Sequence, residues 1–166
     1  MNYDNNRHNA HNEIDHIFQD LFPTRNMAER PEQAALCHRM LDAMVEGGIA
    51  LCDAGTGIGK TYAYLVAGTV YSRFRAACGL GPKPILVSTS SIALQTAARD
   101  EYLPLLSGLL TEDGMISQPL QAVIRKGKSH YVCDERLERR LGQLDLQRKN
   151  WKAGAALLSL RGQLDM

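Results

Sequence analysis

Residues with chemical potential are concentrated in one short stretch, Ala54-Gly55-Thr56-Gly57-Ile58-Gly59-Lys60-Thr61. Closely spaced glycines let consecutive backbone N–H groups turn towards a single anion such as a phosphate. The lysine can place a positive charge on the β- and γ-phosphates, and the threonine hydroxyl can hold Mg²⁺. We therefore predict a nucleotide and Mg²⁺ site with Lys60 and Thr61 as its catalytic side chains. The phosphate-binding residues are Gly55, Thr56, Gly57, Ile58, Gly59, Lys60 and Thr61.

The sequence on either side of this loop predicts the elements that position it. Residues 49–52 are a short apolar run after two glycines, which is typical of a buried strand. Residues 60–74 carry apolar side chains at helical spacing, and a helix N-terminus favours bound phosphate. The order strand, glycine loop, helix is the context that a phosphate-binding loop requires. A glycine-rich turn in another kind of α/β protein is the alternative.

Two further apolar runs predict more strands of the same sheet, at residues 84–89 and 120–124. A helix capped by Ser90 or Ser91 follows the first of these runs and ends near Pro104, and a loop follows over residues 108–119. Strands joined by helices in this way form parallel crossovers. The predicted fold is therefore α/β, with a parallel sheet flanked by helices.

Composition restricts the function less than the motifs do. The 166 residues carry a formal net charge of +1, so overall charge makes no case for nucleic acid. Basic residues gather from Arg125 onward, and a solvated helical face is the simpler interpretation. The four cysteines are widely separated, which indicates neither a zinc site nor a disulfide framework. The absence of a signal-like or membrane-spanning run predicts a cytoplasmic protein with no membrane partner.

The N-terminal part is predicted to change character at about residue 13. Residues 1–12 are polar and Asn-rich, which favours a disordered tail. Residues 13–29 then supply a short amphipathic helix and a linker. Arg30-Pro31-Glu32-Gln33 opens a further helix that extends to Gly47, because proline suits the first helical turn. From its own residues this stretch indicates a capped helix that packs on the sheet.

Four segments in this order resemble the first motor domain of the DinG/XPD-like branch of superfamily 2 DNA helicases, which carries an iron–sulphur cluster. They are Arg-Pro-Glu-Gln at 30–33, Asp-Ala-Gly-Thr-Gly-Ile-Gly-Lys-Thr at 53–61, Ser-Thr-Ser-Ser-Ile-Ala-Leu-Gln at 88–95 and Arg-Lys-Gly-Lys-Ser-His-Tyr-Val-Cys at 125–133. The resemblance implies a RecA-like P-loop NTPase fold, truncated in this chain. It also implies 5′-to-3′ movement on single-stranded DNA, driven by ATP, in the whole helicase.

The resemblance also assigns residues. It places Arg30 and Gln33 at the adenine, Thr89 and Gln95 beside the DNA backbone, and Cys133 as the first ligand of the cluster. Each also has a simpler interpretation: Thr89 caps a helix, Gln95 lies on a solvated face, or Cys133 is a buried thiol. The implied cofactors are ATP and Mg²⁺, with the iron–sulphur cluster in the intact protein. Single-stranded or forked DNA is the implied partner, and a monomer is the expected state.

Departures from the family pattern limit the expected activity. No cysteine follows Cys133, and no apolar strand ends in Asp-Glu-x-His, the pair that orients Mg²⁺ and activates water. We interpret residues 30–132 as a partial helicase ATP-binding domain and residues 133–166 as the start of the iron–sulphur/helical insertion. The chain is thus expected to be the N-terminal portion of a helicase that binds ATP without hydrolysing it. The alternatives are a self-contained P-loop kinase or NTPase, and a non-catalytic remnant that binds partners.

Overall fold

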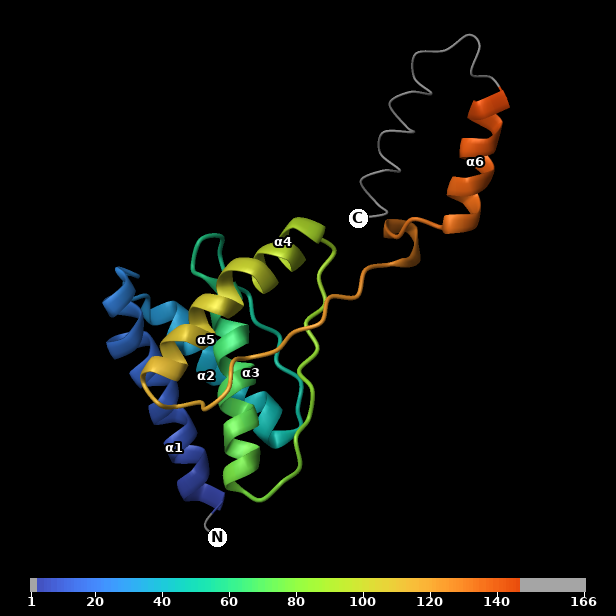
Figure 1. The fold of residues 1–166 in the computed structure, drawn as a ribbon. Coiled ribbons are helices and arrows are strands. Elements are labelled where there is room, and N and C mark those ends of the chain that lie inside the picture. Colours follow the sequence, from blue (N-terminus) through green and yellow to red (C-terminus); the bar gives the residue numbers. More distant parts are fainter. Residues whose placement is uncertain (1–2, 147–166) are drawn as a thin grey trace. The chain divides into compact units, whose positions relative to one another are not determined.

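The structure is a computed structural model that describes residues 3–146. The described residues form helices joined by irregular segments (Figure 1). The chain divides into two compact units, residues 1–124 and residues 125–166. The loop predicted to bind the nucleotide belongs to the first unit.

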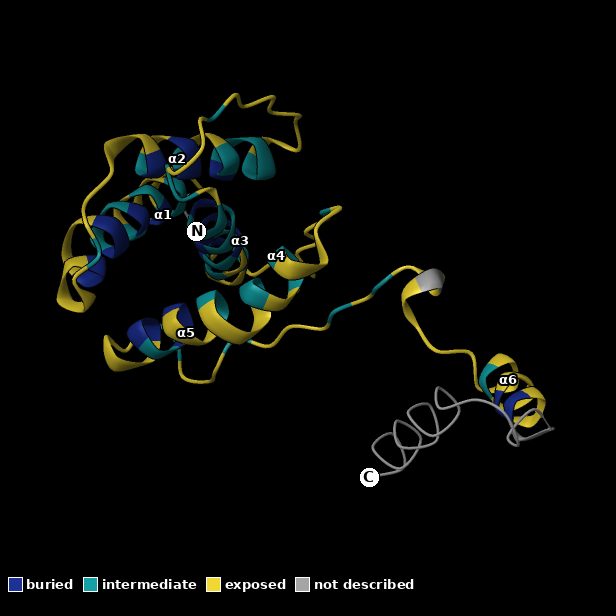
Figure 2. Cartoon of the chain, turned by 90° about the horizontal axis from the view of Figure 1, so that it is seen from above, coloured by how far each residue is buried: buried dark blue, intermediate teal, exposed yellow. Residues whose placement is uncertain are grey.

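The first unit begins with a continuous helical segment. Helix α1 (Tyr3–His16) runs into the π-helical turn η1 (Ile17–Leu21) and the 3₁₀ turn η2 (Phe22–Arg25). Its apolar side chains are buried, as the helical spacing of residues 14–22 predicted (Figure 2). They are Ala10, Ile14, Ile17, Phe18, Leu21 and Phe22.

Helix α1 begins at Tyr3, within the stretch 1–12 that the sequence predicted as a disordered tail. Its polar side chains are held by partners far away in the sequence. Arg7 donates a hydrogen bond to Asp42, 2.5 Å away, and the guanidinium of Arg73 donates two hydrogen bonds to the carboxylate of Glu13 at 2.9 and 2.7 Å. The helix is therefore stabilised by contacts with other helices, which local composition does not reveal.

Helices α2 (Pro31–Glu46) and α3 (Lys60–Ala77) begin where the sequence predicted. Pro31 lies in the first turn of α2, and the helix ends at Gly47, whose φ of 69° is left-handed. Helix α3 packs against both α1 and α2 (Figures 1 and 2). This packing forms the core of the unit and fixes the start of α3, where the predicted loop ends.

A second long helical segment completes the first unit. Helix α4 (Ile92–Ala97), the π-helical turn η3 (Ala98–Tyr102) and helix α5 (Leu103–Glu112) follow one another without a break. The prediction that the helix ends near Pro104 and that a loop starts at 108 is wrong. Pro104 lies just after the π-helical turn η3, which interrupts the regular hydrogen-bond ladder of the segment and so accommodates a residue without an N–H group.

The predicted parallel sheet is wrong for this structure, because residues 3–146 contain no strand. The three apolar runs expected to form strands, residues 49–52, 84–89 and 120–124, are irregular segments. Their side chains are strongly exposed: Ile49 by 93%, Leu51 by 96%, Leu86 by 93% and Val123 by 87%. The α/β class is therefore replaced by an all-helical arrangement in the described part of the chain.

The physical reason is that a strand needs partners that these runs lack. A parallel strand is stabilised by hydrogen bonds to neighbouring strands and by helices that cover both faces of the sheet. Here the helices bury their apolar faces mainly against one another, with Val66 and Val70 of α3 completely buried. Within these runs, the side chain of Ile85 does lie against α3, because a Cβ on Gly68 would be 3.1 Å from it.

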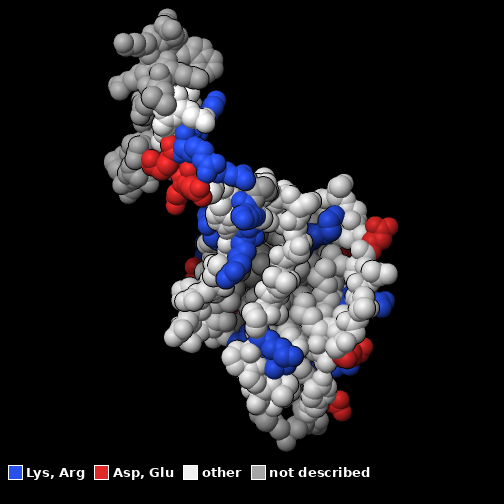
Figure 3. Space-filling view, turned by 90° about the vertical axis from the view of Figure 1, so that its right-hand side faces the viewer, with Lys and Arg blue, Asp and Glu red and all other residues white. Residues whose placement is uncertain are grey.

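The described part of the second unit contains the 3₁₀ turn η4 (Lys128–His130) and helix α6 (Asp134–Leu146). Asp134 and Glu135 occupy the first turn of α6, where negative charge interacts favourably with the helix dipole. Acidic and basic side chains are intermixed on this helix (Figure 3). Arg139 donates a hydrogen bond to Glu135 at 2.8 Å, so Glu135 compensates part of the positive charge of α6. Among the helices of residues 3–146, none is long and apolar enough to cross a membrane.

Candidate nucleotide-binding loop

The predicted loop leads directly into the N-terminus of α3. Gly57 and Gly59 have φ values of 86° and 84°, in the left-handed region that favours glycine. A Cβ atom added to Gly55 or Gly57 would meet no atom within 4 Å, so the backbone there faces open space. Ligand oxygens can therefore approach the loop backbone closely. Thr61 lies half-buried in the first turn of α3.

Lys60 folds back over the beginning of the loop. Its Nζ donates hydrogen bonds to the carbonyl oxygens of Ala54 at 2.9 Å and Gly55 at 2.6 Å. The ammonium group thus lies beside the open backbone of the loop and is itself exposed. A positive charge, accessible glycine backbone and a helix N-terminus fit the phosphate groups of a nucleotide.

The two residues predicted to contact adenine both donate hydrogen bonds to the loop. Gln33 is only 4% exposed, and its Nε2 donates to the carbonyl oxygen of Gly59 at 2.6 Å. Arg30 donates through Nη1 to the carbonyl oxygen of Gly57. Both side chains thus hold the left-handed part of the loop against α2. Sequence reasoning located these residues but not this contact, which depends on how α2 packs against α3.

Replacing Gly59 by alanine is expected to destabilise the fold by about 2–4 kcal/mol, as the sum of backbone strain and the loss of a buried hydrogen bond. The left-handed φ disfavours any Cβ, and the new Cβ would lie 2.8 Å from Cδ of Gln33 and closer still to Nε2. The Gln33 amide would have to leave the Gly59 carbonyl. The free energy of unfolding in urea measures this effect.

Gly57→Ala is the matched control, since Gly57 has a similar φ but a Cβ there meets nothing within 4 Å. It should cost only the backbone strain, about 1–2 kcal/mol. The double variant Gln33→Ala with Gly59→Ala should cost less than the sum of the two single changes, because the overlap is removed. Equal losses for Gly57→Ala and Gly59→Ala would contradict the role given to Gln33.

A groove beside the loop is unsuited to phosphate. It lies between α2 and residues 48–55 of the loop segment. Its lining carries one arginine, Arg39, and more carboxylates than that. The carboxylates belong to Glu32, Asp42, Glu46 and Asp53. Like charges repel a polyphosphate, so we place the candidate phosphate site at Lys60 rather than in this groove.

Thr89 and Gln95, the predicted DNA contacts, lie close together at the start of α4. The Oγ1 of Thr89 accepts a hydrogen bond from the backbone N–H of Ser91 at 3.2 Å, and Gln95 Nε2 donates to the Thr89 carbonyl at 3.3 Å. Ser91 caps α4 by accepting from the backbone N–H of Leu94. The Oε1 atom of Gln95 is buried with no hydrogen-bond partner.

The described cysteines do not assemble an iron–sulphur site. Cys133 has an exposed free thiol, and its backbone carbonyl oxygen accepts a hydrogen bond from the backbone N–H of Leu137 at the start of α6. Cys37 is fully buried in α2, where burial, together with the charge of Asp15, raises the pKa of its thiol. A cluster needs four thiolates, and no group of three or more Cys, His, Asp or Glu side chains in the described residues is placed to hold a metal. The residues that the structure describes therefore do not assemble a complete cluster site by themselves.

An aromatic chain that the sequence did not predict supports the start of α3. Phe18, Phe22, Tyr62 and Tyr102 meet edge to face, with successive ring centroids 5.0, 5.0 and 5.2 Å apart. Tyr62 directly follows Thr61, so this chain connects the N-terminal segment and η3 to the first turn of α3. The helical spacing of Phe18 and Phe22 was visible in the sequence, but their contact with Tyr62 was not.

Comparisons with known proteins relate the chain to one class, the DinG and YoaA helicases. It is 35% identical over 109 residues to the ATP-dependent DNA helicase YoaA of Escherichia coli, and 36% identical over 110 residues to the ATP-dependent helicase DinG of Mycobacterium tuberculosis. It is 31% identical over 117 residues to the 3'-5' exonuclease DinG of Bacillus subtilis. No protein-family model and no solved structure matches.

The resemblance predicted from the motifs is confirmed: the chain has the sequence of a DinG-like helicase N-terminal region. The three matches cover 66–70% of this chain. They cover only 11% of the Bacillus protein and 15% of each of the other two. The chain therefore corresponds to a small part of each of these relatives.

Proposed function

We propose that this chain is the nucleotide-binding portion of an ATP-dependent DNA helicase and that it binds ATP with Mg²⁺ through residues 54–61. The observation that carries the proposal is the glycine loop with left-handed Gly57 and Gly59, which enters an 18-residue helix at Lys60. In that position Lys60 would exchange the loop carbonyl oxygens for phosphate oxygens. The Thr61 hydroxyl would become a ligand of Mg²⁺.

DNA is the proposed partner because the relatives include proteins named ATP-dependent DNA helicases. We assign single-stranded or forked DNA to the region of Thr89 and Gln95 and 5′-to-3′ movement to the whole helicase. A threonine at a helix start can bind a DNA phosphate through its hydroxyl and the neighbouring backbone N–H groups. The chain itself is proposed to act as a monomer.

Binding of ATP without hydrolysis follows from the carboxylates that the chain lacks. A helicase cycle needs an Asp that orients Mg²⁺ and a Glu that activates water, and the sequence contains no Asp-Glu-x-His. Asp134 and Glu135 open helix α6 and belong to the second compact unit. We therefore expect a nucleotide-bound state with no turnover.

The test is a titration of the 166-residue chain with a fluorescent ATP analogue and Mg²⁺, followed by phosphate-release assays with and without single-stranded DNA. We expect saturable binding of the analogue that unlabelled ATP displaces, and no phosphate release. Absence of saturable binding would overturn the assignment of the loop. DNA-stimulated phosphate release that Lys60→Ala abolishes would instead contradict the inactivity, and phosphoryl transfer to a small acceptor without DNA would indicate a kinase.

A further inference from the structure

Two histidine side chains meet through their Nδ1 edges between α1 and α2. The rings of His11 on α1 and His38 on α2 have centroids 5.0 Å apart and planes 23° apart. Their Nδ1 atoms are 2.8 Å from each other, which is a hydrogen-bond distance. At the outer ends of the pair, Nε2 of His11 lies 3.1 Å from Asp42 and Nε2 of His38 lies 2.9 Å from Asp15. The four side chains thus form one line from carboxylate to carboxylate.

The hydrogen bonds in this line fix the number of protons. A carboxylate only accepts, so Nε2 of both rings must carry hydrogen. The contact between the two Nδ1 atoms needs one hydrogen, which belongs to one ring or the other. Three of the four ring nitrogens are then protonated. One ring is therefore a cation and the other is neutral, and the pair holds a single positive charge.

The charges around the pair favour that positive charge. Two carboxylates contact it directly, Asp15 on α1 and Asp42 on α2, and Arg7 on α1 connects Asp42 to the carboxylate of Glu46 on α2. Arg7 donates to Asp42 at 2.5 Å and to Glu46 at 2.7 Å. Although burial opposes ionisation of Asp42, the hydrogen bond from Arg7 and the charges of His11 and Arg7 lower the pKa of its carboxyl group. The surroundings are therefore net negative, and the two imidazole side chains are only about one quarter exposed.

We propose that His11 and His38 share one proton and form a pH-sensitive latch that holds α1 against α2 only while the pair carries a single positive charge. With a second proton from the solvent, two Nδ1–H groups would point at each other across 2.8 Å. If the pair loses its shared proton, each ring carries one hydrogen only. Either the lone pairs of the two Nδ1 atoms then face each other, or one ring keeps its hydrogen on Nδ1 and its Nε2 no longer donates to the aspartate. The latch is therefore closed in an intermediate pH window and open on both sides of it.

Amide hydrogen exchange of α1 in the full chain tests the latch. The protection of α1 should pass through a maximum in the pH window where the pair holds one shared proton, and it should fall on both sides of that window. Loss of a charge-assisted hydrogen bond at a partly exposed site should lower this protection by about three- to tenfold at either extreme. Protection factors are corrected for the intrinsic pH dependence of exchange.

The variants separate this pair from the other histidines. His11→Gln and His38→Gln keep a side chain able to donate to the aspartates but cannot share a proton, so the maximum should disappear. His8→Gln is the matched control, because His8 is exposed on the same helix, and its profile should keep the maximum. His16 lies on the same helix, and a hydrogen bond with Asp20 raises its pKa although burial opposes this. Its contribution is the same in every variant compared, because none of them changes His16.

Nitrogen-15 NMR of the histidine rings gives a second, direct test. Within the window we expect Nε2–H on both rings and one hydrogen averaged between the two Nδ1 atoms. His11→Gln should abolish the averaged signal of His38. Two neutral rings throughout the window would overturn the proposal, as would a maximum in α1 protection that survives in His38→Gln.

Discussion

Replacing Lys60 by alanine is expected to weaken MgATP binding by about 10- to 100-fold, the loss that follows when a charged group no longer donates to phosphate oxygens. The exposed ammonium group already lies beside the open backbone of the loop, with the Ala54 and Gly55 carbonyl oxygens as its acceptors. A bound nucleotide would replace these acceptors by phosphate. Isothermal titration with ATP and Mg²⁺ measures the loss.

Stability should hardly change in Lys60→Ala, because exposed surface side chains contribute within about 0.5 kcal/mol. Lys83→Ala is the matched control, since Lys83 is an exposed lysine of the same compact unit outside the loop. It should bind MgATP as the unaltered chain does. Equal affinities of the two variants would mean that the nucleotide does not use this loop. An unfolded Lys60→Ala variant would contradict the exposure of its side chain.

The helices that the sequence predicted well are those whose signals are local. Pro31 suits a first turn, Gly47 adopts the left-handed conformation that ends α2, and Lys60 follows a run of glycines that cannot continue a helix. Each of these signals depends on the backbone preferences of a few neighbouring residues. The sequence alone was therefore sufficient to place the loop at the N-terminus of α3.

The failures concern features that depend on distant partners. An apolar run such as residues 84–89 predicts a strand from its own composition, but a strand forms only if neighbours accept its hydrogen bonds. Helix α1 shows the converse, because its first residues are polar and are stabilised by partners such as Asp42 on another helix. Neither kind of partner can be recognised within a window of ten residues.

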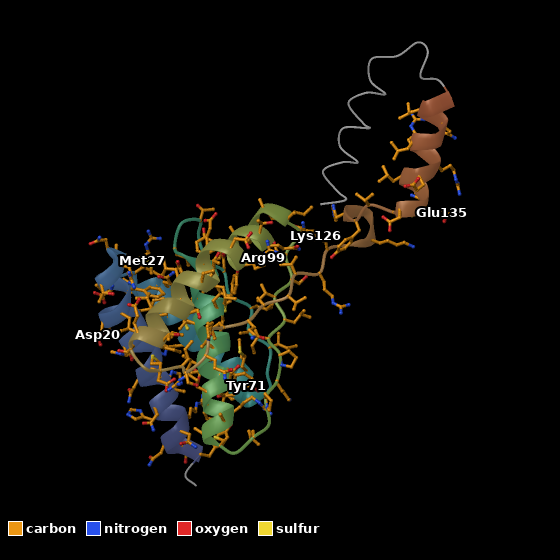
Figure 4. The ribbon with its side chains drawn as sticks, viewed as in Figure 1. Asp20, Met27, Tyr71, Arg99, Lys126 and Glu135 are labelled. Atoms are coloured by element: carbon orange, nitrogen blue, oxygen red, sulfur yellow. The ribbon has the colours of Figure 1, made fainter. Side chains whose placement is uncertain are left out.

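The candidate site divides in the same way. Residue type and spacing identified Lys60 and its glycines, because phosphate binding is a property of the loop backbone itself. The orientation of Gln33 towards Gly59 depends on the packing of α2 against α3 and was not predictable from Arg-Pro-Glu-Gln. Arg99 and Tyr71, labelled in Figure 4, belong to η3 and α3, two elements whose mutual arrangement again depends on residues far apart in the sequence.

Phe22→Ala is expected to lower the free energy of unfolding by about 3–5 kcal/mol, the range for removing a buried aromatic side chain. Phe22 is 2% exposed and lies edge to face with both Phe18 and Tyr62, at centroid distances of 5.0 Å. Its loss would leave a cavity and remove the middle ring of the aromatic chain. Urea unfolding followed by circular dichroism measures the change.

Phe22→Leu keeps most of the apolar volume and so provides a variant that should still fold. It should lose the ring contacts, about 0.5–1.5 kcal/mol for each pair, with a smaller cavity. Because Tyr62 adjoins Thr61, MgATP affinity should fall in this variant as the first turn of α3 loosens. Lys60→Ala should differ from this variant in stability: its MgATP affinity should fall while its free energy of unfolding stays unchanged. A loss below about 1 kcal/mol in Phe22→Ala would mean that the aromatic chain does not hold α3 in place.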